Sequence, residues 1–163
     1  MASTWPDQHE NVMDKLADLF ATITTVGGYN TNPTVRRFYV PPPALGDDDF
    51  PCIQVLPGPH TDNLRVLTFD ANSVKLLRIP RDDEAVISVS ARGTDATVKE
   101  TVYQELGKAV MDVVRILMEN PTLGGYVDFM VSISWEYGQS VGTSIIGEAL
   151  GSLRFHYTHN PLA

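Results

Sequence analysis

The chain has 163 residues and a formal net charge of −8, and 43% of its residues are hydrophobic. This length and composition are those of one soluble globular domain, 1–163, with a single core. The acidic balance argues against a surface that grips nucleic acid, because such binding depends on lysine and arginine neutralising phosphates. No apolar run approaches the roughly 18 residues that span a bilayer, so we expect no membrane partner.

The N-terminus and the cysteine content indicate where the protein folds. The first ten residues hold neither a basic segment nor an apolar one, so we expect no secretory signal. Cys52 is the only cysteine. It cannot form an internal disulfide, which fits assembly in a reducing cytoplasm.

The first predicted element is a helix over residues 9–25. Its apolar residues fall three and four apart on one face: Val12, Leu16, Leu19, Phe20 and Ile23. The pair Gly27-Gly28 ends this helix, since glycine commonly follows a helix end. A strand over 34–40 comes next and stops at three consecutive prolines, which cannot donate into a ladder.

The next stretch is dominated by loops. Asp47, Asp48 and Asp49 form an exposed acidic loop, and prolines bound a short strand of about five residues within 50–59. Residues 60–73 have no clear period. We interpret 57–73 as an arm or long loop with room for a short strand, and loops of this length are often functional.

The centre of the chain predicts two strands and the longest helix. Residues 74–80 and 85–93 read as strands, with a polar turn at 81–84 between them. The helix covers 94–120, where Thr97 and Glu100 have the form of a capping box and Thr94 is an alternative cap one turn earlier. It ends at Pro121, because the residue before proline avoids helical angles. Its apolar stripe comprises Val98, Val102, Leu106, Val110, Val113 and Leu117.

Two further strands, 127–137 and 152–157, complete the chain. In the first of them Phe129 and Trp135 have the same parity, which predicts that both pack in the core. Helices separated from runs of strands indicate an α+β fold, a mainly antiparallel sheet with two helices packed on one face.

The sequence Gly138-Gln139-Ser140-Val141-Gly142 matches G-x-S-x-G, the turn that presents the serine of many hydrolases. That turn needs a helix after it, but 143–151 contains two glycines that disfavour one. Glu148, His156 and His159 are the remaining partners, and the rest of the chain is too short for a hydrolase sheet. We therefore interpret the stretch as a glycine-rich connection between antiparallel strands, with a small serine hydrolase as the least favoured alternative.

No other pattern predicts chemistry. The three aspartates lack the offsets of a calcium loop, and His156 and His159 fall on opposite faces of a strand, which disfavours a shared zinc ion. The glycine pairs at 27–28 and 124–125 match no phosphate-binding motif. We expect no catalytic residue, metal or cofactor, and a protein that works through its surfaces rather than an enzyme. Free strand edges would allow copies to join by sheet augmentation.

The element order resembles that of the tail terminator (tail completion) proteins of long-tailed bacteriophages. The features that carry the resemblance run through most of the chain: the first helix ending near Val26-Gly27-Gly28, the Phe50–Val55 strand after its proline, the alternating Ala85–Ala91 strand, the long helix with Leu106, Asp112, Val113 and Leu117, the turn Asn120–Gly125, and the final Phe155-His156-Tyr157.

The resemblance implies a structural virion protein. Family members form a ring, typically hexameric, that caps the head-proximal end of the tail tube, stops its polymerisation and provides the surface for head–tail joining. Its partners would be further copies of itself, the tube protein, the connector or neck protein and, in contractile tails, the sheath. DNA would pass through the lumen without specific binding, and an acidic lining would repel it.

We expect the arm and the acidic loop to contact neighbouring subunits or rings. The candidate interface residues are Asp47, Asp48, Asp49, Leu64, Arg65, Val66 and Phe69. A neck or head-completion protein that joins the connector remains an alternative of the same structural class.

Overall fold

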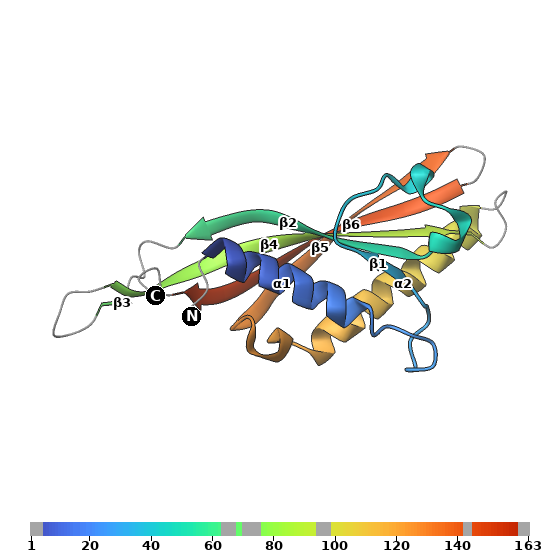
Figure 1. Cartoon of the computed structure of the whole chain (residues 1–163). Helices are drawn as coiled ribbons and strands as arrows, with labels where there is room; N and C mark the ends of the chain where they lie inside the picture. The colour runs from blue at the N-terminus through green and yellow to red at the C-terminus, as the bar shows by residue number, and fades with distance from the viewer. Residues whose placement is uncertain (1–4, 63–67, 70–75, 94–98, 142–144, 160–163) are drawn as a thin grey trace.

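The computed structural model describes residues 5–62, 68–69, 76–93, 99–141 and 145–159 (Figure 1). The fold is α+β, as the sequence predicts. The helices are α1 (Trp5–Phe20) and α2 (Lys99–Glu119), and the strands are β1 (Thr34–Arg36), β2 (Cys52–Asp62), β3 (Thr68–Phe69), β4 (Leu76–Arg92), β5 (Phe129–Val141) and β6 (Ile145–His159). Three short 3-10 turns are η1 (Pro42–Ala44), η2 (Asp47–Asp49) and η3 (Leu123–Gly125).

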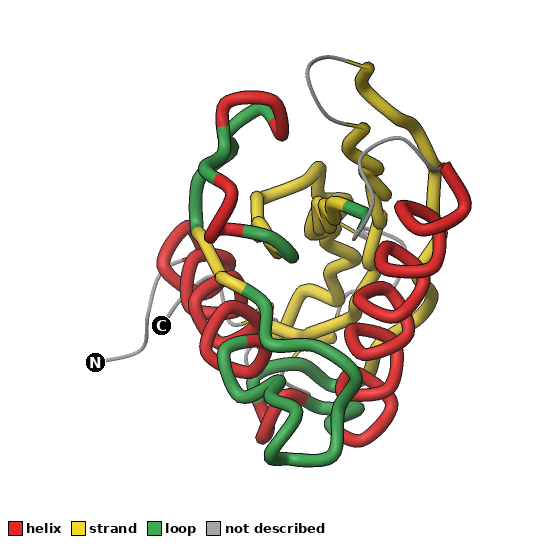
Figure 2. Tube along the Cα trace, turned by 90° about the vertical axis from the view of Figure 1, so that its right-hand side faces the viewer, coloured by secondary structure: helices red, strands yellow, loops and turns green. Residues whose placement is uncertain are grey.

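The strands form one mainly antiparallel sheet in the order β1-β2-β4-β6-β5, with β3 paired to the outer end of β4. Only β1 and β2 are parallel. The two helices pack on one face of the sheet, which we call the helix face; the end-on view separates them as two columns beside the strands (Figure 2). On the opposite, open face, the connection between β1 and β2 arches over part of the sheet.

The core lies between the helices and the helix face of the sheet. Alternate residues of each central strand point into it, as the pleat requires, and burying each large apolar side chain contributes about 1.5–3 kcal/mol. The largest buried side chains are Met13, Leu16, Phe20 and Ile23 with Leu106 and Ile116 from the helical side, and Ile53, Ile87, Leu153 and Phe155 from the sheet.

A polar cluster inside this core also joins α1 to the sheet. The Asp83 carboxylate is fully buried and accepts a hydrogen bond of 2.7 Å from the Tyr157 hydroxyl. His9 Nδ1 of α1 lies 3.2 Å from the same oxygen of Asp83. Buried carboxylates need such partners, so this cluster fixes the position of the first half of α1 on β4 and β6.

The polar turn predicted at 81–84 is wrong, because β4 runs unbroken through it. Asp82 and Glu84 point to the open face, where Asp82 pairs with Arg154 and His156, and Glu84 accepts from Ser152. Asp83 points the other way into the polar core cluster. Each of these acidic residues has a partner on the neighbouring strand β6, so their charges do not interrupt the pairing of β4 with β6.

The strand predicted within 50–59 is longer than expected. β2 continues through Pro57 and Pro59 to Asp62, with a shift in pairing register between Pro57 and His60. Prolines are tolerated here because, among the described strands, this stretch of β2 pairs with β4 alone and its other edge has no partner. Residues 57–62 of the predicted arm are therefore strand, and β2 and β4 extend as a ribbon beyond the helices (Figure 1).

β1 is shorter than the predicted strand over 34–40. Arg37 turns toward α1, where Nε lies 2.8 Å from Asp14 and Nη2 lies 2.8 Å from Glu10. The backbone of Val40 is bound by the buried Gln54 side chain instead of by a strand. Side-chain bonds to the backbone compete with ladder bonds and end the strand at Arg36.

Both helices keep their predicted apolar faces but begin or end at different residues. α1 stops at Phe20 rather than Thr25, and turns carry the chain to Gly28, which has a φ of 87° that favours glycine. α2 ends at Glu119, directly before Asn120-Pro121 as predicted. Its predicted capping residues Thr94 and Thr97 lie outside the described residues.

The C-terminal strands form a long antiparallel hairpin with a register from Phe129↔His156 to Val141↔Ile145. A bulge lies between Met130 and Ser132. An extra residue reverses the faces, so the expectation that Phe129 and Trp135 share the core is wrong. Trp135 lies partly buried on the helix face, whereas Phe129 is 52% exposed on the open face.

Candidate interaction surfaces

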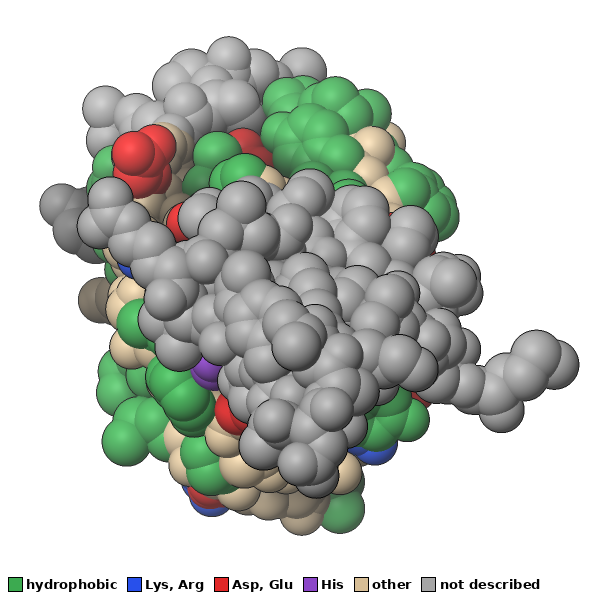
Figure 3. Space-filling view, turned by 90° about the vertical axis from the view of Figure 1, so that its left-hand side faces the viewer, with side chains coloured by type: hydrophobic (Ala, Val, Ile, Leu, Met, Phe, Trp, Pro, Cys, Tyr) green, Lys and Arg blue, Asp and Glu red, His purple; other side chains and the backbone are tan. Residues whose placement is uncertain are grey.

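The first predicted interface is the arm. Leu64, Arg65 and Val66 lie outside the described residues. Phe69 belongs to β3, and its backbone pairs with Leu76 of β4. The ribbon end of the molecule has few lysine or arginine atoms on the part of its surface that the structure describes (Figure 3).

The second predicted interface, the acidic loop, forms the 3-10 turn η2. Asp49 accepts hydrogen bonds of 2.9 Å from the Gly46 amide and from Arg36. The Gly46 bond and the Arg36 guanidinium hold the pKa of Asp49 below its usual range. Asp47 forms an ion pair with Arg92 of β4, and Asp48 is exposed. Two of the three aspartates therefore fix the loop to the sheet, and Asp48 remains at the surface.

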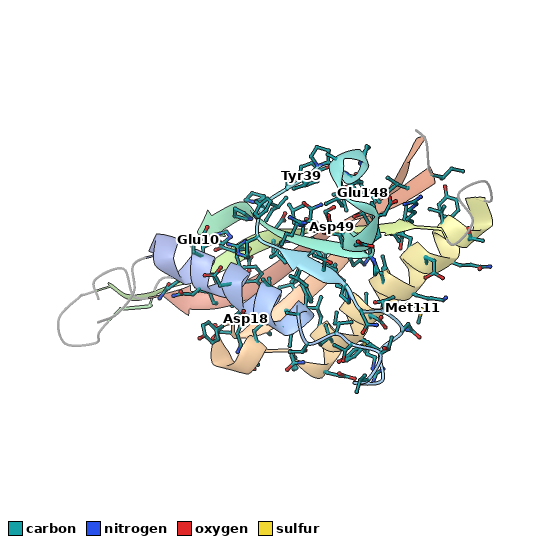
Figure 4. The ribbon with its side chains drawn as sticks, turned by 45° about the vertical axis from the view of Figure 1, so that its right-hand side comes forward. Glu10, Asp18, Tyr39, Asp49, Met111 and Glu148 are labelled. Atoms are coloured by element: carbon teal, nitrogen blue, oxygen red, sulfur yellow. The ribbon has the colours of Figure 1, made fainter. Side chains whose placement is uncertain are left out.

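The connection between β1 and β2 covers one end of the open face. Tyr39 and Glu148 lie together there (Figure 4), and the Tyr39 hydroxyl is 3.2 Å from Oε1 of Glu148. Ser88 donates to the same carboxylate oxygen at 2.7 Å. Burial, followed by the negative charge of Glu148, raises the pKa of Tyr39. These contacts hold the connection as a cover over β4 and β6.

At the other end of the open face, Phe129 and His156 lie side by side. The Phe129 ring stacks on His156 with a centroid separation of 4.9 Å, and His156 Nδ1 lies 2.9 Å from Asp82 Oδ1. His156 thus belongs to a pair with a carboxylate. Across the described residues, no group of three histidine, cysteine, aspartate or glutamate side chains is placed to hold a metal ion.

An apolar groove lies on the helix face between the C-terminal half of α2 and β5. Its volume is about 250 Å³, and it is lined by Leu117, Met118, Pro121, Met130, Val131, Ser132, Ile133 and Leu153. A second depression, of about 540 Å³, follows the outer side of α2. Met111, labelled in Figure 4, is 69% exposed there, and Met118 is 76% exposed. Continuous exposed apolar surface on a soluble chain commonly marks an interaction site.

The sequence did not predict this groove. Its residues come from α2, β5 and β6, and they meet only because α2 covers β4 and β6 but leaves β5 beyond its edge. One signal was present in the sequence. Met111 and Met118 lie one heptad apart, outside the core stripe of the long helix.

The loop that contains Asn30 and Thr31 is hydrogen-bonded to α2 and borders the depression on the outer side of that helix. Asp112 is buried and accepts from the Asn30 amide at 3.0 Å, from Asn30 Nδ2 at 2.8 Å and from the Thr31 hydroxyl at 2.7 Å. Arg115 donates to the Gly28 carbonyl at 2.8 Å, and its guanidinium lies 4.6 Å over the Tyr29 ring. These bonds give the loop a fixed position beside the exposed methionines.

The G-x-S-x-G stretch does not have the geometry of a nucleophile-bearing turn. Gly138 to Val141 are strand residues of β5, and Ser140 pairs with Ile146 of β6. The segment from Ile145 onward is a strand rather than the helix that such a turn requires. The predicted antiparallel strands are confirmed, but the glycine-rich connection expected between them is wrong in extent, because residues 138–141 and 145–151 belong to the paired strands. The alternative of a serine hydrolase built on this motif loses its structural basis.

None of the helices in the described part of the chain is long and apolar enough to cross a membrane. Among known proteins, no protein-family model matches this chain, and no curated sequence matches it.

Proposed function

We propose that this protein is a bacteriophage tail terminator. Copies form a ring, of six in keeping with the resemblance, that caps the head-proximal end of the tail tube. The ring stops tube growth and gives the connector or neck protein a surface to join. In a contractile tail it also touches the sheath.

The observation that supports this proposal is the agreement in element order. The resemblance in sequence implies an N-terminal helix, a sheet, a long second helix and a final pair of strands, and the fold has these elements in this order. The exposed apolar groove beside α2 and the ribbon extending past the helices are surfaces suited to contacts with other chains. The net charge of −8 suits a lumen that DNA crosses without binding.

The proposal predicts a specific partner. The purified protein should bind assembled tail tubes of the phage that encodes it and should leave the portal and adaptor rings of the same phage unbound in the absence of tubes. Co-sedimentation with each assembly measures this directly. Binding to the portal or adaptor but not to the tube would replace the terminator with the neck or head-completion protein.

A further inference from the structure

The sheet has one long edge, on β5, whose protective features are confined to one charged residue and the bulge between Met130 and Ser132. β5 is the last strand of the sheet and pairs only with β6, so among the described strands its other edge has no partner over 13 residues. About half of the amides and carbonyls of such a strand point outward and seek a partner. β5 contains no proline and no lysine, and Glu136 is its only charged residue. Edges left free in monomers usually carry several of these protective residues.

The remaining free edges of the described strands offer little to pair with. β1 has three residues and β3 has two. The free edge of β2 is interrupted by Pro57 and Pro59. A strand as long as β5 therefore finds its best match in another β5.

We propose that two copies of this chain pair through their β5 edges as a two-fold antiparallel dimer with one continuous sheet. The partner is a second copy of this chain, because among the described edges only another β5 offers a strand of matching length. Val131 is 48% exposed and Tyr137 is 60% exposed along this edge, and pairing removes part of that apolar surface from water.

The side chains fix the register. A two-fold axis perpendicular to the sheet keeps both helix faces on one side, so paired residues that follow the bulge between Met130 and Ser132 must have numbers of the same parity. Centred on Trp135, the register places Ile133 opposite Tyr137 and Trp135 opposite its own copy. These residues lie on the helix face with the apolar groove of α2, so the two copies form one apolar stripe.

The open face of the same register avoids charge repulsion. Glu136 of each copy lies opposite Ser134, and both residues are exposed. A register centred on Glu136 would bring the two carboxylates directly together, which is destabilising. The charge pattern thus favours the register in which residues 132–138, which follow the bulge, pair with the same residues of the second copy.

This contact is separate from the proposed ring. A two-fold contact closes on two copies, whereas a cyclic ring of six is built from head-to-tail contacts. We assign the dimer to the free protein before it meets its partners. Its existence does not depend on the protein being a tail terminator.

Two matched substitutions test the dimer. Ser134→Glu places a carboxylate opposite Glu136 twice in the dimer, and Ser134→Lys places an ammonium group there instead. We expect the dissociation constant of the Glu variant to exceed that of the Lys variant by about tenfold or more, since each of the two cross-strand pairs changes sign. Light scattering and sedimentation over a concentration series measure it. Circular dichroism checks that both variants keep the fold.

The outcomes are distinct. A concentration-dependent dimer in the natural chain, weakened by Glu and kept or strengthened by Lys, supports the proposal. A natural chain that stays monomeric up to about 100 µM would overturn it. Equal constants for the two variants would overturn the pairing of Ser134 with Glu136. Tube binding by a chain that stays monomeric would leave the proposed function standing and remove the dimer.

Discussion

Replacing Asp112 with alanine should destabilise the protein by removing the acceptor that holds the 30–31 loop on α2. The buried Thr31 hydroxyl donates to this carboxylate at 2.7 Å, and a hydrogen bond to a charged group contributes about 1.5–3 kcal/mol. The Asn30 donors are exposed and can turn to water, so they add less. Alanine is the better helix former by up to about 0.7 kcal/mol, which offsets part of the loss. The expected net loss is about 2–3 kcal/mol.

Urea unfolding followed by circular dichroism measures this free energy. Thr31→Val is the matched partner, because it removes the donor from the same buried bond. The double variant should lose less than the sum of the single losses by about 1 kcal/mol, since contacting residues are coupled. A loss below about 0.5 kcal/mol for Asp112→Ala, or additive single losses, would refute the role assigned to this carboxylate.

Three further outcomes follow from other sites. Gly151→Ala should lower the free energy of unfolding by about 1–3 kcal/mol, because the new Cβ would lie 2.6 Å from the Trp135 ring. Gly138→Ala should be nearly neutral, because no atom lies within 4 Å of its new Cβ. Thermal unfolding of the two variants compares these effects. The pKa of Asp49 is lower in the folded protein than in the unfolded chain, where it is about 4. The Asp49 carboxylate therefore stabilises the fold fully above the unfolded-state pKa, and this stabilisation is lost as the pH falls through the folded-state pKa. The deficit of Asp49→Asn in urea should therefore shrink on acidification, and a constant deficit would contradict the ion pair. Burial raises the pKa of Cys52, so iodoacetamide should modify it only on unfolding, as mass spectrometry can follow.

Periodicity predicted the parts of the fold in which one face is buried. The apolar stripe of α2 and the alternation of residues 85–91 follow directly from a helix and a strand packed against one core. The prediction of a turn at 81–84 was wrong because it treated the acidic residues of this stretch as solvent-exposed. Their partners, Arg154, His156 and Tyr157, lie more than seventy residues away and meet them only in the folded sheet.

The candidate surfaces could be predicted less well than the core. The exposure of Asp47 and Asp48 could be predicted from the sequence, but the ion pairs that fasten their loop to the sheet could not. The face of the sheet on which Phe129 lies was predicted wrongly, because a bulge leaves no periodic pattern in the sequence. The free edge of β5 depends on strand order, which is a property of the whole fold, although the lack of proline and lysine in this strand is visible in the sequence.

The measurement that tests the central proposal most directly is the growth of tail tubes in the presence of the protein. Tube protein encoded in the same genome, whose presence the proposal requires, is polymerised with increasing amounts of the purified chain, and tube lengths are measured by electron microscopy. The proposed terminator role predicts shorter tubes, each with a ring of density at one end. Tubes of unchanged length with bare ends, at concentrations at which the protein is folded, would contradict it.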